Sequence, residues 1–421
     1  MIILKEKSQC CGCNACVQRC PKHCITMAED KEGFSYPQVD VSKCIECGLC
    51  EKVCPILNAG DRQKPIKVLA AFNVNEKIRY ESSSGGVFTL FAEETLKAGG
   101  IVFGAKFDKD WNVVISYTEK IEELGSFRGS KYVQADVRDS YKNCEAFLKE
   151  GRRVLYTGTP CQIAGLKRFL GKEYENLLTI DILCHGVPSP MIWRRYLKEE
   201  IKKIYTARGG LGKKYRFDIS KCISSIKDIK FRDKSDGWKK FRFVLKLAEA
   251  PAEGKKSSVL SSYELNQCFY DNIFMKAFLS DLILRPSCYT CQFRGEDNRK
   301  SDISIADFWG IGDVIPEIDD DKGMSLVIFN NDKYKSSEIY KNIKFREVRI
   351  HDAAKYNNPL RQVLPSNPRR KLFFKKIKNK KYIYPYLELF CLPEWQYEYA
   401  ITPKWRKALR KLKGIVINKI H

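Results

Sequence analysis

The chain has 421 residues and a formal net charge of +24, and 44% of its residues are hydrophobic. This length supplies more than one core, so we expect a globular protein of several domains. No run of about 18 apolar residues occurs to span a bilayer, and no signal region opens the chain, which predicts a cytoplasmic protein. The charge suits an acidic protein, an anionic lipid surface or a phosphorylated ligand, whereas nucleic acid is disfavoured because no recognition motif accompanies the charge.

Eighteen cysteines in a reducing compartment indicate metal ligands or redox groups rather than disulfides. Two runs near the N-terminus, CCGCNACVQRCP and CIECGLCEKVCP, each fit C-x2-C-x2-C-x3-C-P. Three cysteines at this spacing surround one iron–sulfur cube, and the fourth, followed by proline, binds the other cube. The pattern resembles a bacterial two-cluster 4Fe-4S ferredoxin domain over residues 1–60. The predicted ligands are Cys10, Cys13, Cys16 and Cys54 for the first cluster, and Cys44, Cys47, Cys50 and Cys20 for the second.

Structural zinc is the alternative for these runs, since zinc sites also use pairs of CxxC. Two copies that each end in Cys-Pro favour iron–sulfur clusters. Cys11 fits neither spacing, and Cys24 lacks ligand spacing and is predicted to be a packing residue.

The stretch SSSGGVFTLFAEETLKAGG, from residue 82, predicts a helix with Ser83 or Ser84 as its N-cap. A helix start rich in serine and glycine exposes N–H groups that suit the pyrophosphate of a dinucleotide. An ordinary capped helix is the alternative.

Two strand–turn–helix units follow, RRVLYTGTPCQIAGLKRFL and NLLTIDILCHGVPSPMIWRRYLKEEI. If their strands are parallel neighbours, Cys161 and Cys184 leave the same carboxyl edge of a sheet. A later CxxC adds Cys288 and Cys291, and four thiolates are enough for a third 4Fe-4S cluster. Two alternatives stay open: buried packing, and a reactive Cys161 thiol paired with His185.

Five segments in order resemble the coenzyme F-420 hydrogenase/dehydrogenase beta-subunit family, over residues 66 to about 330. They are SSSGGVFTLFAEETLKAGGIVFGAKFD, FRGSKYVQAD, VLYTGTPCQIAGLK, DILCHGVPSP and CYTCQF with SDISIADFWGI. The resemblance implies FAD and iron–sulfur clusters, with electrons passing between them and on to a deazaflavin or another organic acceptor. It also associates such bacterial chains with surface polysaccharide pathways.

The resemblance implies site residues by position. The flavin-binding residues that it implies are Ser83, Ser84, Gly85, Gly86, Ser130 and Lys131. His185 and Lys131 are the candidate catalytic groups. Asp302, Asp307 and Trp309 fall in the SD…DFWG motif, where Trp309 suits ring stacking or the core.

Residues 205–260 alternate as strands of an antiparallel insert. Residues 369–421 then hold 15 Lys or Arg and only three Glu, so 351–421 is predicted to be a basic tail. Within it, residues 403–421 predict an amphipathic basic helix, either on an anionic membrane surface at the inner face or packed on the protein.

We therefore expect a mixed α/β multi-domain fold, with a ferredoxin-like two-cluster domain, a mixed α/β flavin-binding core, an antiparallel insert and a basic helical tail. The expected domains are 1–60, 66–190, 191–350 and 351–421. The predicted function is that of an iron–sulfur flavoprotein oxidoreductase that passes electrons between 4Fe-4S clusters and FAD to an unidentified organic acceptor, with an acidic ferredoxin or flavodoxin as partner. The alternative is an electron-transfer subunit or adaptor without flavin.

Overall fold

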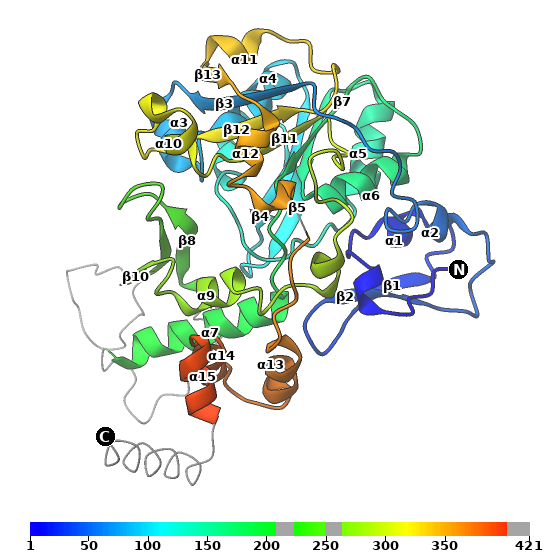
Figure 1. The fold of residues 1–421 in the computed structure, drawn as a ribbon. Coiled ribbons are helices and arrows are strands. Elements are labelled where there is room, and N and C mark those ends of the chain that lie inside the picture. The colour runs from blue at the N-terminus through cyan, green and yellow to red at the C-terminus, as the bar shows by residue number, and fades with distance from the viewer. Residues whose placement is uncertain (208–222, 249–262, 362, 402–421) are drawn as a thin grey trace, which may run out of the picture.

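The computed structural model describes residues 1–207, 223–248, 263–361 and 363–401 (Figure 1). The N-terminal domain consists of a two-stranded antiparallel sheet and two short helices. Its strands are β1 Ile25–Glu29 and β2 Ser35–Val39, and its helices are α1 Ala15–Arg19 and α2 Leu49–Lys52. Each helix lies inside one of the two cysteine runs, so the fourth cysteine of each run leaves at a helix end.

An eight-stranded mixed sheet forms the centre of the molecule, in the order β13-β3-β12-β11-β7-β6-β4-β5. The parallel strands are β4 Ile101–Phe107, β6 Val154–Gly158, β7 Leu177–Ile182 and β11 Ile303–Asp307. The antiparallel strands at both sides are β5 Val113–Thr118, β12 Ser325–Phe329, β3 Lys67–Asn73 and β13 Ile343–Glu347. The inner strands are largely buried and have a nearly continuous apolar sequence, whereas the edge strand β13 is mostly exposed and polar. The sheet confirms the mixed α/β expectation.

Helices cover this sheet. They are α3 Glu76–Glu81, α4 Val87–Lys97, α5 Ser140–Lys149, α6 Pro160–Leu170, α10 Ile311–Val314, α11 Glu338–Lys341 and α12 Ile350–Ala354. Helix α6 begins with a capping box between Thr159 and Gln162, and Pro160 occupies its first position. Helix α4 is capped by Gly86 at φ +80° and not by the expected serines, whose hydroxyls bond elsewhere.

A second, antiparallel sheet lies where the insert is predicted over residues 205–260, as far as that range is described. Its strands are β8 Ile226–Asp233, β9 Arg242–Leu247 and β10 Tyr263–Cys268. Helices α7 Pro190–Ala207 and α9 Ile273–Leu279 pack against it in the largest apolar cluster of the described residues.

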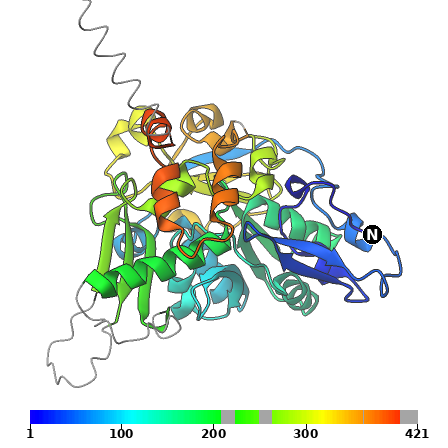
Figure 2. The ribbon, with the colours of Figure 1, turned by 90° about the horizontal axis from the view of Figure 1, so that it is seen from below.

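The segment expected to be a basic tail is folded as far as it is described. Helices α13 Arg370–Ile377, α14 Tyr384–Phe390 and α15 Glu394–Ile401 lie beside α7 (Figure 2). Phe373, Ile377 and Leu387 are buried in the same cluster as α7, because these positions place apolar side chains on one face of each helix. The apolar faces of α13, α14 and α15 are therefore part of the core, while the predicted amphipathic helix over 403–421 lies outside the described residues. None of the described helices has the length and apolar character that crossing a membrane requires.

Candidate functional site

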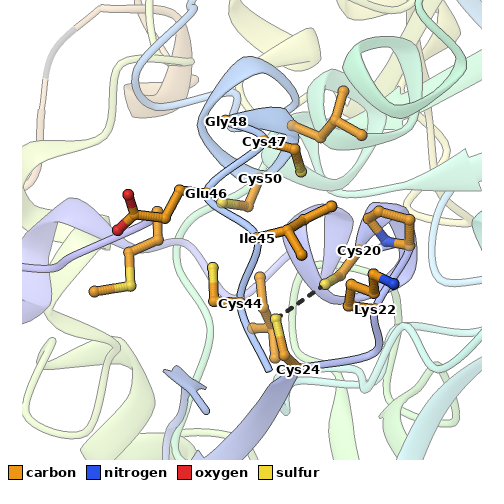
Figure 3. A pocket seen from close by; sticks show the side chains of 13 residues that line it. Cys20, Lys22, Cys24, Cys44, Ile45, Glu46, Cys47, Gly48 and Cys50 are labelled. Carbon is orange, nitrogen blue, oxygen red and sulfur yellow. Dashed lines mark hydrogen bonds between the residues drawn. The ribbon is translucent and has the colours of Figure 1, made fainter. Parts of the chain in front are cut away.

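Four thiols of the N-terminal domain, of which one is exposed, lie around one pocket, and we call them the outer thiol group: Cys20, Cys44, Cys47 and Cys50. They line one pocket with about 350 Å³ of empty space, and Figure 3 shows their side chains around it. Cys47 is exposed. Cys24 lines the same pocket, with its Sγ 3.4 Å from that of Cys20, so it is a packing neighbour of a predicted ligand. The structure thus brings together the four residues predicted for the second cluster.

The four residues predicted for the first cluster also lie together, and we call them the inner thiol group: Cys10, Cys13, Cys16 and Cys54. Burial raises the pKa of Cys16 to about 12, and negative charge on Cys10 and Cys54 adds to the effect. Cys13 is within electrostatic reach of Cys10 and Cys16. Cys50 of the outer group acts on both Cys16 and Cys54, so the two groups are neighbours.

A third set of thiols lines a larger pocket, with about 550 Å³ of empty space, between the N-terminal domain and the sheet. Cys161 is the second residue of α6, and Cys184 follows β7. Because β6 and β7 are parallel neighbours, both cysteines leave the same sheet edge, as predicted. Cys288 lies in the 3-10 turn η3 Pro286–Thr290, and Cys291 follows it. The N-terminal domain contributes Cys11 and Ile56 to this domain-joining pocket.

The domain-joining pocket is lined by cations and by no carboxylate of the described residues. Arg285, Arg294 and Arg299 line it, and all three are buried. Burial raises the pKa of Cys288 to about 12 and that of Cys291 to about 11. Thiols of this kind give up their protons when a metal supplies positive charge. The donor set and the surrounding guanidinium groups therefore fit an iron–sulfur cluster of net negative charge.

No three His, Cys, Asp or Glu side chains of the described residues converge closely enough to hold a single metal ion. A four-iron cube takes one thiolate at each of its four irons, so its ligands stand further apart than those of one ion.

Cys11 connects the inner thiol group to the domain-joining pocket. Its side chain lies near enough to both Cys13 and Cys161 to interact with the two thiols. Sequence reasoning found no role for Cys11, because neither spacing includes it and its partner Cys161 lies 150 positions later along the chain.

The N-terminal domain sits close against α6 because Gly165 leaves room for Cys13. A Cβ at Gly165 would lie 2.9 Å from the Cβ of Cys13 and 2.9 Å from the Tyr141 hydroxyl. We expect Gly165→Ala to lower the free energy of unfolding by about 1–3 kcal/mol through overpacking. Chemical denaturation measures this, with Gly125→Ala as the control, since nothing lies within 4 Å of a Cβ there. Equal stability of the two variants would contradict the close packing.

The predicted flavin residues divide into two sets. Ser83 and Ser130 share hydrogen bonds: Ser130 N donates to Ser83 Oγ at 2.6 Å, and the two hydroxyls lie 2.9 Å apart. Lys131 Nζ donates to the carbonyls of Arg128 and Gly129, and burial lowers the pKa of Lys131 to about 7. These three predicted residues are therefore close together.

Ser84 and Gly85 instead fasten their loop to the sheet. Ser84 Oγ donates to the Met324 carbonyl at 2.7 Å, and Gly85 N donates to Ser325 Oγ at 3.0 Å. A Cβ at Gly85 would lie 2.6 Å from the Ala71 carbonyl oxygen, so the position requires glycine. The Gly85 N–H, which the sequence offered to a phosphate, is already bonded.

The remaining candidates have partners of their own. His185 Nε2 lies 2.7 Å from Asp281 Oδ1, while Cys161 Sγ lies 3.2 Å from Thr159 Oγ1, so His185 and Cys161 share a pocket but each bonds elsewhere.

The residues of the SD…DFWG motif contact other side chains and backbone groups of the protein interior. Asp302 accepts hydrogen bonds from Thr179 N and Oγ1, both at 2.7 Å. Asp307 pairs with Arg232. The Trp309 ring stacks on Trp238, with centroids 4.7 Å apart, so its observed stacking partner is a core side chain.

Lys234 directly follows β8 in the antiparallel insert. It holds the loop that contains Ser83 and Ser84 in place. Its Nζ donates to the carbonyls of Arg79, Ser84 and Lys322 at 2.6–2.8 Å. We expect Lys234→Met to cost about 2–4 kcal/mol of unfolding free energy, because it leaves buried carbonyls unpaired. Lys230→Met, at an exposed position on the same strand, is the control in thermal or chemical unfolding. Equal losses in both variants would contradict this role.

Two family models match the chain. Residues 151–349 match the C-terminal region of the coenzyme F-420 hydrogenase/dehydrogenase beta subunit, and residues 9–57 match the 4Fe-4S dicluster domain. Both matches agree with the resemblance seen in the sequence.

Similar proteins include a subunit of the F(420)H(2) dehydrogenase of Methanosarcina mazei, 24% identical over 237 residues, which are 52% of this chain and 68% of that protein. Coenzyme F-420-dependent sulfite reductase of Methanocaldococcus jannaschii is 27% identical over 51% of this chain, and the match covers 36% of its own length. Among solved structures, the F-420-reducing NiFe hydrogenase complex from Methanosarcina barkeri aligns over 76% of this chain and 90% of the matched chain, at 16% identity and a TM-score of 0.38.

These matches identify an iron–sulfur, electron-transfer type of redox protein. Residues 151–349 of the chain therefore match the C-terminal region of the coenzyme F-420 hydrogenase/dehydrogenase beta-subunit family, and a 4Fe-4S dicluster domain lies in front of them.

Proposed function

We propose that this protein conducts electrons between three 4Fe-4S clusters and a flavin, and on to an organic acceptor. The main supporting observation is that Cys161, Cys184 and the Cys288–Cys291 pair, from three separate segments, line one pocket with three buried arginines. Four thiols with surrounding positive charge and no lining carboxylate form a site for an anionic cluster. When bound, such clusters carry single electrons, and a flavin can collect two.

The order of the three thiol sets in space supports a linear route for electrons from the outer group to the domain-joining pocket. The outer group includes the exposed Cys47, and its Cys50 neighbours Cys16 and Cys54 of the inner group. From the inner group, Cys11 bridges Cys13 to Cys161. The protein therefore holds the three sets in sequence from the surface to the sheet edge.

For the flavin we propose FAD, at the loops of Ser83, Ser130 and Lys131. Lys131 supports this because a half-buried amine whose pKa is lowered to about 7 by desolvation gains from an anionic ligand that stabilises its charged form. Ser84, Gly85 and Lys234 fix the loop in place behind it.

The proposed partner is an acidic electron-transfer protein that docks at the outer thiol group. The net charge of +24 and the exposure of Cys47 support this. Exposed Val41 and Ile45 flank Cys44 and would add apolar contact.

The test is the content of iron, acid-labile sulfide and released flavin per chain, on full-length protein purified without oxygen. About twelve irons with one FAD are expected. About eight irons without flavin would overturn the third cluster and the flavin together, and would favour an electron-transfer subunit of two clusters.

A further inference from the structure

Arg285 is a buried cation whose described partners carry no carboxylate charge. Its side chain is fully buried. The guanidinium donates to the carbonyls of Cys10 and Ser35 at 2.8 and 3.0 Å, and to Gln134 Oε1 at 3.0 Å. It also lies 4.4 Å from the ring centroid of Tyr36. A buried charge is costly unless an opposite charge compensates it, so an anionic group bound beside Arg285 would supply the charge that these neutral partners do not.

Two of the three thiol sets meet at this guanidinium. Its Nη2 lies 3.5 Å from Cys10 Sγ of the inner group. On its other side Arg285 lines the domain-joining pocket, where its charge acts on Cys161 and Cys288 and opposes the rise in the pKa of Cys288 that burial causes. Arg285 therefore faces both predicted cluster sites from between them.

We infer that Arg285 is the shared counter-charge of the inner and third clusters, and that it raises the reduction potential of both. This inference rests on the proposed function. Reduction adds negative charge to a cluster, and a nearby cation in a low-dielectric interior stabilises the reduced form more than the oxidised form. One residue thereby shifts the potentials of both centres in the same direction.

Arg294 offers a matched control. It lines the domain-joining pocket and donates to the carbonyls of Cys184 and His185. The thiols whose charge acts on it are Cys184, Cys291 and Cys288, which all belong to the third site, and its other charged neighbour is Arg299 of the same pocket. Removing the Arg294 charge should affect only the third cluster.

The experiment is a redox titration of the full chain, monitored by electron paramagnetic resonance. The signal of the third cluster is identified as the one that is lost in Cys161→Ser. We expect Arg285→Gln to make the inner and third clusters about tenfold harder to reduce, a shift of ~59 mV for a one-electron couple. The outer cluster should keep its potential. Arg294→Gln should shift the third cluster alone, and Arg285→Lys should shift both clusters less than Arg285→Gln does.

If Arg285→Gln shifted the reduction potential of only one of these two clusters, or of neither, the inference would be overturned. If Arg285→Gln loses iron while Arg285→Lys retains both clusters, the positive charge is needed for assembly, which supports it. Loss of iron from both variants would assign Arg285 to folding and overturn it. Wild-type protein with only about eight irons would instead overturn the third cluster of the proposed function, which separates the two failures.

Discussion

Replacing Cys161 with serine should remove about four of about twelve irons per chain, because a serine hydroxyl is a poor substitute for the thiolate that a 4Fe-4S cluster requires. Cys161 lines the domain-joining pocket with Cys184, Cys288 and Cys291, and its charge acts on all three of these thiols. The eight cysteines of the dicluster domain remain, so the other irons should stay. Iron and sulfide analysis of the anaerobically purified variant measures the loss.

Cys391→Ser is the matched control for this variant. Cys391 is half-buried at the end of α14 and lines neither pocket, so its replacement should leave the iron content unchanged. If Cys161→Ser retained all of its iron, the third cluster would have to do without this ligand, and buried packing would be the better interpretation of Cys161.

Replacing Trp193 with alanine should cost about 3–5 kcal/mol of unfolding free energy, a large part of the ~5–15 kcal/mol that holds a typical domain together. Trp193 on α7 is fully buried among aromatic rings, with Phe231 and Phe274 at centroid distances of 5.0 and 5.1 Å. Its Nε1 donates to the Trp111 carbonyl at 2.8 Å. The variant leaves a cavity and an unpaired carbonyl, so thermal unfolding should begin far below that of the parent protein.

Trp395→Ala removes the same side chain from an exposed position on α15, where 70% of the residue is accessible. Its unfolding free energy should stay within about 0.5 kcal/mol of the parent. Similar losses at both tryptophans would contradict the assignment of the α7 cluster as the main core.

Local patterns predicted much of the candidate site. The four-cysteine runs depend only on spacing within about a dozen residues, and they matched a 4Fe-4S dicluster domain. The parallel pairing of β6 and β7 followed from two strand–turn–helix units, and it brought Cys161 and Cys184 to one edge. Both inferences succeed because covalent spacing and strand connection restrict where a side chain can lie.

Other assignments failed or could not be made, because competing contacts act between distant segments. The serines expected to cap α4 bond to Met324 and Ser130 instead, which leaves Gly86 as the cap. Helices α13 and α14 looked like a basic tail by charge, but one apolar face of each packs on the core.

The sequence by itself therefore determined the kind of chemistry: a dicluster domain, further cysteines at a sheet edge and a redox family. Only the tertiary structure decided how these parts connect. It set Cys11 between Cys13 and Cys161, and it buried Arg285 between two thiol sets. The physical reason is that the contacts of Cys11 with Cys161 and of Arg285 with Cys10 join residues more than a hundred positions apart. They exist only once the packing of α6, the N-terminal domain and the sheet has fixed their distances.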